Sequence, residues 1–270
     1  MNSQNKGVAV ITGASSGIGA VYADRLARRG YDLIIVARNR DRLNALAKRI
    51  TEETNRTVDV VSADLNNKSD LARVEAVLKQ NTRITMLVNN AGIGTFAPLL
   101  ESDINKMDEM ISLNISALTR LTYAAVPGLV ERGTGTIINI SSIVGIAPEV
   151  LNGVYGASKA YVLAFSHSLQ HELASKGIQI QAVLPGATAT EFWDIGGMPV
   201  SHLPAETVMT TENLVDAALA GLDQGELITI PALPDKAEWD TFEKARRDMA
   251  ARLSLAKPAA RYGISAPSNI

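Results

Sequence analysis

The sequence predicts an α/β fold, a doubly wound parallel sheet of about seven strands with helices on both faces. Short apolar runs rich in β-branched residues alternate with longer segments of helical periodicity, four times before residue 92. The chain has 270 residues, 46% of them hydrophobic, which is enough for one large core. No internal repeat or linker interrupts the pattern. We therefore expect a single domain over residues 1–270 with right-handed crossovers.

The first half of the chain supplies four strands. The first of them, residues 8–11, is an apolar run of the kind found in a strand buried on both faces. The expected strands are 8–11, 32–37, 57–62 and 86–88, and the expected helices begin after Gly19, at Asp41 and at Lys68. The second helix covers 41–54, with Asp41 as its N-cap, and the third ends near Gln80.

The second half continues the alternation. A long helix is expected after Asp103, then a strand through Ile137, Ile138 and Ile140 and a helix carrying Tyr155 and Lys159. The remaining elements are a strand over 178–184, a helix over 212–224, a strand over 226–230 and a helix over 235–254. Residues 231–270 are expected to form a C-terminal helical extension that covers a cleft or meets a neighbouring subunit.

Composition excludes several classes of function. A formal net charge of −2 provides no basic field for nucleic acid or acidic membranes. The chain has no cysteine, and its three histidines do not show a zinc-binding spacing, so we predict no metal site. No apolar run approaches the ~18 residues of a membrane helix, and no signal peptide precedes Gly7. We expect a cytoplasmic protein that binds neither nucleic acid nor membranes.

The stretch 137–161 carries the strongest sign of chemistry. Tyr155 and Lys159 lie one helical turn apart, so both side chains leave the same face. Ser142 stands where the preceding strand ends, the edge from which an open α/β sheet presents its site. A free phenol has a pKa near ~10, so its use as a base at neutral pH requires a shift of about 3 units, roughly 4 kcal/mol. The Lys159 cation can supply a shift of that sign, and Ser142 can hydrogen-bond a substrate carbonyl.

A glycine-rich turn follows the first strand, with the sequence TGASSGIG at 12–19. Its glycines allow a sharp turn and a close approach of the backbone to a ligand, and the amides of the following helix attract a pyrophosphate. The spacing G-x-x-x-G-x-G differs from the commoner G-x-G-x-x-G, because Tyr22 stands where that pattern has its third glycine.

In combination, TGASSGIG at 12–19, NNAG at 89–92, Asn114, Ser142, the Tyr155-x-x-x-Lys159 pair and Pro185-Gly186 resemble the short-chain dehydrogenase/reductase family. The resemblance covers roughly residues 5–230 and implies a Rossmann-like fold. It also implies hydride transfer between a nicotinamide and a substrate carbon, with Tyr155 as general acid and base. By the same resemblance, Ser142 orients the oxygen, Lys159 lowers the pKa of Tyr155 and contacts the nicotinamide ribose, and Asn114 bends its helix and supports a proton relay.

The end of the second strand bears on the choice of cofactor. An NAD site commonly has an acid here, whereas this chain has Ala37 followed by Arg38, whose guanidinium suits the 2′-phosphate of NADP. We therefore expect NADP(H) as the preferred cofactor and NAD(H) as an alternative one. The other interpretation is that Arg38 only solvates the start of the next helix. Similarly, Asp64 either meets the adenine, as in relatives, or serves in a turn that leads into a helix.

The cofactor contacts implied by the resemblance are Gly13, Ser15, Ser16, Gly17, Ile18, Gly19, Arg38, Asp64, Leu65, Asn90, Ala91, Gly92, Tyr155, Lys159, Pro185, Gly186, Thr188 and Thr190. Thr188 departs from the family pattern, which usually has an aliphatic residue there. Residues 186–210 are expected to form a substrate-loop lid, because they mix glycine and proline with Phe192, Trp193 and Met198. An ordinary surface loop is the alternative.

The predicted function is an NADP(H)-dependent oxidoreductase, a carbonyl reductase or alcohol dehydrogenase for a small-molecule ketone or aldehyde. One alternative is a 3-oxoacyl carrier-protein reductase, which needs a basic docking patch that the linear sequence does not show. Another is a non-catalytic NADP-binding sensor or scaffold, against which the intact set of Ser142, Tyr155, Lys159 and Asn114 argues. The family resemblance also implies a homodimer or homotetramer.

Overall fold

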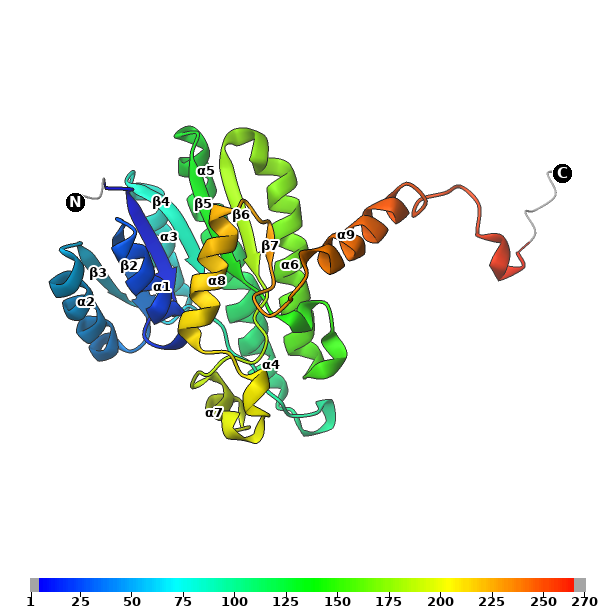
Figure 1. Ribbon diagram of the computed structural model, residues 1–270, viewed down its shortest axis with the longest axis horizontal. Coiled ribbons are helices and arrows are strands. Elements are labelled where there is room, and N and C mark those ends of the chain that lie inside the picture. The colour runs from blue at the N-terminus through cyan, green and yellow to red at the C-terminus, as the bar shows by residue number, and fades with distance from the viewer. Residues whose placement is uncertain (1–4, 265–270) are drawn as a thin grey trace. The chain divides into compact units, whose positions relative to one another are not determined.

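In the computed structural model, which describes residues 5–264, seven parallel strands form one sheet in the order β3-β2-β1-β4-β5-β6-β7 (Figure 1). The strands are β1 Val8–Thr12, β2 Asp32–Ala37, β3 Val58–Ser62, β4 Ile84–Asn89, β5 Gly135–Ile140, β6 Ile178–Val183 and β7 Ile228–Thr229. The strand order reverses between β1 and β4, which makes their carboxyl ends the switch point where ligands bind in such sheets. The predicted doubly wound α/β fold is confirmed.

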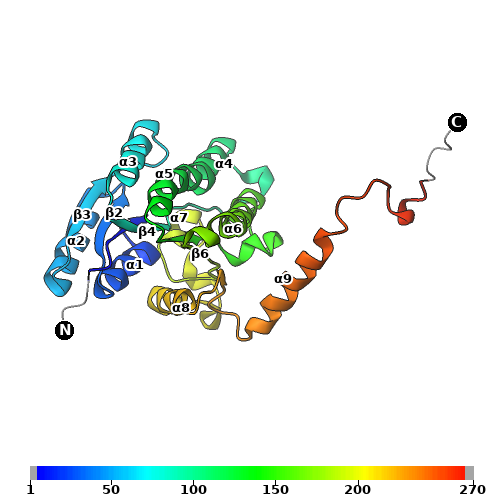
Figure 2. The ribbon, with the colours of Figure 1, turned by 90° about the horizontal axis from the view of Figure 1, so that it is seen from above.

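Helices cover both faces of the sheet (Figure 2). They are α1 Gly17–Arg28, α2 Arg40–Thr54, α3 Lys68–Gln80, α4 Ile104–Ile111, α5 Leu118–Glu131, α6 Gly153–Leu173, α7 Phe192–Gly196 and α8 Thr211–Asp223. The alternation along β1 explains the two layers, because Ile11 packs with the apolar residues of α1, α2 and α8, and Val10 packs with those of α3, α5 and α6. Each face of the strand therefore has its own core.

Helix α2 begins one residue earlier than the sequence predicts. Its N-cap is Asn39, whose side-chain oxygen accepts a hydrogen bond from the backbone of Arg42 at 3.0 Å. The prediction of Asp41 as N-cap is therefore wrong. Asp41 lies in the first turn instead, where its carboxylate faces the positive end of the helix dipole.

The long helix expected after Asp103 is divided into three parts. Helix α4 is capped by Asp103, which accepts from Asn105, and it passes into a π-helical turn, Ser112–Ala117, before α5 begins. Asn114 lies in this turn and is buried. Single π turns inside α-helices commonly mark functional positions, since they rotate the following side chains relative to the helix before them.

The chain divides into two compact units, Met1–Pro231 and Ala232–Ile270. The second unit contains α9, Lys236–Ala250, which is capped by Asp235 and ends four residues before the predicted boundary. Within α9 the rings of Trp239 and Phe242 lie 5.2 Å apart, as the helical spacing of these residues predicts. The role of the extension stays a prediction. Over residues 5–264, no helix combines the length and the apolar character that crossing a membrane requires.

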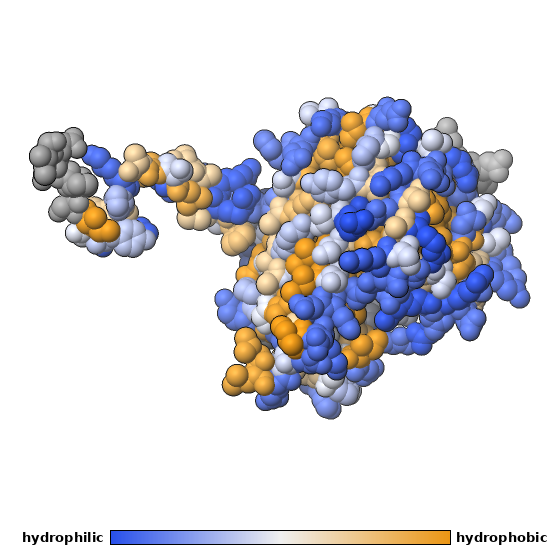
Figure 3. Space-filling view, turned by 180° about the vertical axis from the view of Figure 1, so that it is seen from behind, coloured by the Kyte–Doolittle hydropathy of each residue, from blue (hydrophilic) through white to orange (hydrophobic). Residues whose placement is uncertain are grey.

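Large apolar side chains are exposed on the segment that leads into α4. Leu99, Leu100 and Ile104 are 82%, 94% and 69% exposed. Hydrophobic and hydrophilic side chains alternate in patches on the face of the molecule seen in Figure 3. The homo-oligomer implied by the sequence stays a prediction.

Candidate active site

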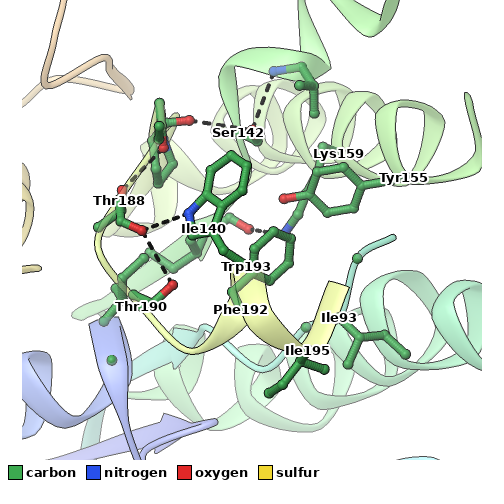
Figure 4. A pocket seen from close by; sticks show the side chains of 18 of the residues that line it. Ile93, Ile140, Ser142, Tyr155, Lys159, Thr188, Thr190, Phe192, Trp193 and Ile195 are labelled. Atoms are coloured by element: carbon green, nitrogen blue, oxygen red, sulfur yellow. Dashed lines mark hydrogen bonds between the residues drawn. The ribbon is translucent and has the colours of Figure 1, made fainter. Parts of the chain in front are cut away.

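A cavity of about 500 Å³ opens at the carboxyl ends of the strands, where the segments that follow β1, β4, β5 and β6 meet (Figure 4). Most of the predicted site residues line it. They are Gly13, Ser16, Gly17, Ile18, Asn90, Ala91, Gly92, Ser142, Tyr155, Lys159, Pro185, Gly186, Thr188 and Thr190. Predicted residues up to 177 positions apart in the chain (Gly13 to Thr190) thus contribute to one site.

The glycine-rich turn has the close backbone packing that its composition predicts. Gly13 and Gly17 adopt φ values of +67° and +53°, which L-residues with a Cβ rarely adopt. A Cβ on Gly19 would lie 2.3 Å from the Gly13 carbonyl oxygen, so no larger residue fits there without movement. The turn therefore presents bare backbone at the cavity, directly before the first amides of α1.

Thr12 and Asn90 join this turn to the NNAG segment. The Asn90 side-chain nitrogen donates to the carbonyl oxygens of Thr12 at 2.8 Å and Gly13 at 3.1 Å. In return, the Thr12 hydroxyl accepts from the backbone nitrogens of Asn90 and Ala91, both at 3.0 Å. These bonds satisfy the polar groups at the ends of β1 and β4 and fix the floor of the cavity.

Ser142 follows β5 and is 8% exposed. Its hydroxyl donates to the Pro185 carbonyl oxygen and accepts from the Val144 amide, each at 3.3 Å. Both distances are long for hydrogen bonds that involve a hydroxyl. The hydroxyl is therefore held by weak contacts, and a substrate oxygen can replace the Pro185 carbonyl oxygen as the acceptor of its hydrogen bond.

Helix α6 positions Tyr155 and Lys159 side by side. Its N-cap, Asn152, accepts from the amide of Tyr155 at 3.3 Å and so fixes the first turn. One turn later, the Lys159 ammonium donates to the Ile140 carbonyl oxygen at 2.9 Å, and the Ser141 hydroxyl donates to the Lys159 carbonyl oxygen at 2.8 Å. The Lys159 nitrogen lies 5.7 Å from the centre of the Tyr155 ring.

Burial dominates the titration of both groups. It raises the pKa of Tyr155 to about 12, although hydrogen bonding by Ser142 acts in the opposite direction. It also lowers the pKa of Lys159 from 10.5 to about 8. Only the Ser142 hydroxyl opposes the effect of burial on the phenol here, so the lowering of the Tyr155 pKa by Lys159 stays a prediction. At neutral pH the phenol keeps its proton and the amine remains mostly charged.

Asn114 supports the site from behind. Its amide donates to the Ile93 carbonyl oxygen at 2.9 Å and to the Ser158 hydroxyl at 3.1 Å, and its oxygen accepts from the Ile93 amide at 3.0 Å. Ser158 donates in turn to the carbonyl oxygen of Tyr155 at 2.8 Å. The buried amide thus connects the π turn to the segment after β4 and to the helix that carries Tyr155.

Some predicted residues do not line the cavity. They are Ser15, Gly19, Arg38, Asp64, Leu65 and Asn114. Arg38 is exposed just beyond β2, and its carbonyl oxygen accepts from the hydroxyl of Ser62 at the end of β3. Leu65 is buried in the core, and the Asp64 carboxylate accepts from the Asn66 amide at 3.0 Å, a contact that fits its alternative role in a turn.

Two aromatic side chains of the predicted lid, Phe192 and Trp193, line the cavity on its apolar side, and Phe96, which the sequence did not assign to the site, packs against them. Phe96 and Trp193 stack with ring centroids 4.9 Å apart, and Phe192 lies 5.6 Å from the Tyr155 ring. The Trp193 indole donates to the Thr188 carbonyl oxygen at 2.8 Å, which fixes α7 against the preceding loop. The stack could not be predicted from local sequence, because Phe96 precedes Trp193 by nearly a hundred residues.

Thr188, the departure from the family pattern, is almost fully buried. Its hydroxyl donates to the carbonyl oxygen of Gly186 at 3.1 Å, so its polar group is satisfied within the loop. Ile93, Val144 and Leu151 also line the cavity and were not predicted. Within residues 5–264, no three side chains of His, Asp or Glu gather as a group that could hold a metal ion.

A family model described as short chain dehydrogenase matches residues 7–195 of this chain. The chain is also 38% identical, over 216 residues, to a very-long-chain 3-oxoacyl-CoA reductase of Anas platyrhynchos, and the match covers 78% of this chain and 67% of that protein.

Two similar solved structures cover nearly the whole chain. A short-chain dehydrogenase from Sphingobium yanoikuyae in complex with NADPH has a TM-score of 0.91 at 47% identity, over 95% of this chain and 100% of that one. A bulky-bulky ketone specific alcohol dehydrogenase from Comamonas testosteroni has a TM-score of 0.88 at 44% identity, over 96% and 99%.

Proposed function

Because this chain belongs to the short-chain dehydrogenase family, we propose that it is an NADP(H)-dependent oxidoreductase that interconverts a ketone or aldehyde and its alcohol. One observation carries the proposal. The buried, protonated phenol of Tyr155 lines the same cavity as the Ser142 hydroxyl, with the Lys159 ammonium one helical turn away. A proton donor, a hydrogen-bond donor and a cation at one point are what reduction of a carbonyl requires of a protein.

The residues at the mouth of the cavity fit a dinucleotide. The backbone of Gly13 and Gly17 and the first amides of α1 suit a pyrophosphate. Beside Asn90 on the floor of the cavity, Gly92 has no side chain, and a Cβ there would meet neighbouring atoms. When bound, the nicotinamide group supplies or accepts the hydride. NADPH or NADP is present in similar solved structures, and the exposed guanidinium of Arg38 after β2 supports a preference for the phosphorylated cofactor.

In the direction of reduction, Tyr155 acts as general acid. Its raised pKa keeps the proton on the phenol until the substrate oxygen develops negative charge. Ser142 then holds that oxygen, having exchanged its long bond to the Pro185 carbonyl oxygen for one to the substrate. Lys159, anchored by Ile140, stabilises the phenolate as it forms, because the attraction of opposite charges is strong in a buried site.

The substrate is proposed to be apolar and large. The cavity away from Tyr155 is lined by hydrophobic side chains, among them Leu151, Phe192, Trp193 and Met198. Residues 186–210 are proposed as the lid over it, with α7 as the part nearest the phenol. The similarity to a dehydrogenase described as specific for bulky-bulky ketones supports a ketone with apolar groups on both sides.

Reduction of a 3-oxoacyl thioester is the second candidate. It is favoured by the similarity to 3-oxoacyl-CoA reductases, whose chains this protein matches over about two thirds of their length. A long acyl group would also find an apolar cavity favourable. The non-catalytic sensor remains the alternative if cofactor binds without turnover.

The test is NADPH oxidation across a panel of small ketones, bulky diaryl or aryl-alkyl ketones, aldehydes and 3-oxoacyl thioesters, repeated with NADH. We expect turnover with NADPH and bulky ketones. Tyr155→Phe should lose that turnover by at least about 10²-fold while still binding NADPH. Tyr123→Phe, at a tyrosine 69% exposed on α5, is the matched control and should retain it. Turnover by Tyr155→Phe at the parent rate would contradict the assignment.

A further inference from the structure

An ion pair joins the base of the proposed lid to the helix after β2. Arg42, in the first turn of α2, donates to the carboxylate of Glu191 at 2.7 Å. Glu191 lines the cavity and is the N-cap residue of α7, the helix that carries Phe192 and Trp193. The pair therefore connects the proposed cofactor site, at the start of α2, with the proposed substrate lid, at the start of α7.

The Glu191 end of the ion pair lies beside the glycine-rich turn. A Cβ built on Gly17 would lie 3.2 Å from the side chain of Thr190, which precedes Glu191. The pKa of Glu191 is held below its usual range chiefly by the Arg42 guanidinium, with a smaller contribution from the side chain of Ser16. Glu191 thus places a carboxylate next to the segment that we propose to receive the anionic part of a dinucleotide.

Another anion can readily replace Glu191 as the partner of Arg42. Both side chains are about half exposed, at 49% and 52%, and pairs of that kind contribute little to stability. Arg42 contacts the carboxylate through one terminal nitrogen, Nη1, whereas a guanidinium can grip a phosphate with two. A phosphomonoester carries more negative charge than a carboxylate at neutral pH, so it competes well for the same cation.

We propose that Arg42 is a second phosphate-binding guanidinium, in addition to Arg38, for the ribose phosphate of NADP(H), and that Glu191 is its intramolecular competitor. The inference rests on the proposed function. Binding of the phosphorylated cofactor exchanges Glu191 for phosphate on Arg42 and releases the N-terminal end of α7. A cofactor without the ribose phosphate leaves the pair intact. The exchange of Glu191 for phosphate on Arg42 then sets both the preference for the phosphorylated cofactor and the position of the lid.

The test measures binding of nucleotide fragments, so it needs no turnover. Adenosine 2′,5′-bisphosphate is the probe, AMP is the control ligand, and titration calorimetry gives both dissociation constants. Arg42→Met should weaken the bisphosphate about tenfold and leave AMP unchanged, since one charge-assisted contact is lost. Glu191→Gln should tighten the bisphosphate by about threefold to tenfold and AMP by less, because AMP has no 2′-phosphate to compete for Arg42.

The double variant distinguishes competition from simple repulsion. If Glu191 acts through Arg42, adding Glu191→Gln to Arg42→Met changes nothing further; if its charge merely repels the ligand, the double variant binds the bisphosphate more tightly than Arg42→Met alone. Asp216→Asn is the matched control, because Asp216 is a carboxylate of similar exposure that pairs with Arg25 at 2.7 Å far along the chain. It should affect neither ligand.

Two results overturn the inference. One is bisphosphate binding by Arg42→Met with the parent dissociation constant, and the other is tightening by Glu191→Gln that persists without Arg42. In both cases NADPH would still bind the parent chain, and the proposed function would stand. A parent chain that binds neither NADPH nor the bisphosphate would instead contradict the proposed function, and the inference with it.

Discussion

The ammonium of Lys159 is held by the carbonyl oxygen of Ile140, the last residue of β5, at 2.9 Å. The sheet, and not the neighbouring phenol, therefore fixes the position of the cation. This leaves the Tyr155 oxygen free to face the cavity with its proton, while the charge remains close enough to stabilise the phenolate that forms on proton transfer. The arrangement suits reduction, in which the enzyme must begin with a protonated acid.

The first prediction concerns the pH dependence of reduction. Because the pKa of Lys159 is lowered to about 8 and that of Tyr155 is raised to about 12, the cation is lost long before the phenol ionises. We expect kcat/KM for reduction of a ketone to be level below about pH 8 and to fall about tenfold per pH unit above it. The check is a pH profile at saturating NADPH. A level profile up to about pH 10 would show that the charge on Lys159 is not needed.

The second prediction is that Lys159 costs stability. Its pKa falls from 10.5 in the unfolded chain to about 8 in the folded one, a difference worth roughly 3 kcal/mol. Below pH 8 this cost is fully present. It disappears as pH rises toward 10.5, because the unfolded chain then binds more protons than the folded one. The buried ammonium is therefore least favourable at the pH where it is useful.

Lys159→Met should accordingly raise the free energy of unfolding at pH 7 by about 2 kcal/mol, after allowance for the hydrogen bond that Ile140 loses. The gain should shrink as pH approaches 10.5, and turnover should be lost throughout. Urea denaturation of parent and variant at both pH values measures it. Lower stability of the variant at pH 7 would mean that the contact with Ile140 outweighs the cost of burying the charge.

The third prediction concerns Tyr22, which replaces the last glycine of the commoner dinucleotide pattern. Its side chain is fully buried in α1, and its hydroxyl has no hydrogen-bond partner among residues 5–264. Burial raises the pKa of this phenol, which therefore stays neutral. Tyr22→Phe removes an unsatisfied polar group and keeps the ring, so it should raise the free energy of unfolding by about 1 kcal/mol. Tyr123→Phe, at an exposed position, should change it by less than about 0.5 kcal/mol. A destabilised Tyr22→Phe would point to a partner for the hydroxyl.

The sheet was predictable because short stretches rich in β-branched residues alternate with segments of helical periodicity, and such a pattern is visible in the local sequence. The trio of Ser142, Tyr155 and Lys159 was predictable for a similar reason, since one helix and one strand end bring them together. Other features depend on contacts between distant segments. The stack of Phe96 on Trp193 arises only after the loop following β4 meets the loop following β6.

Two further features, the N-cap of α2 and the pKa of Tyr155, each depend on two competing local effects. Asn39 and Asp41 are both good caps, and the choice depends on where the backbone leaves β2. The pKa of Tyr155 is raised by desolvation against the hydrogen bond from Ser142, and the spacing of residues along a helix does not report burial. The spacing of Tyr155 and Lys159 therefore predicts which groups lie together, whereas the burial that raises the pKa of Tyr155 becomes visible only in the folded chain.

The fourth prediction tests the cofactor assignment. Arg38 is exposed at the end of β2, so Arg38→Asp should leave the fold intact. The substitution removes a cation that suits the ribose phosphate and adds a repelling charge, so the ratio of NADPH to NADH affinity should fall by about hundredfold. Lys48→Asp makes the same change of charge further along α2, on an exposed side chain, and should alter the ratio by less than about threefold. Fluorescence titration with each cofactor gives both dissociation constants. An unchanged ratio in Arg38→Asp would assign Arg38 to solvation of the helix start and move the recognition of the phosphate to other residues.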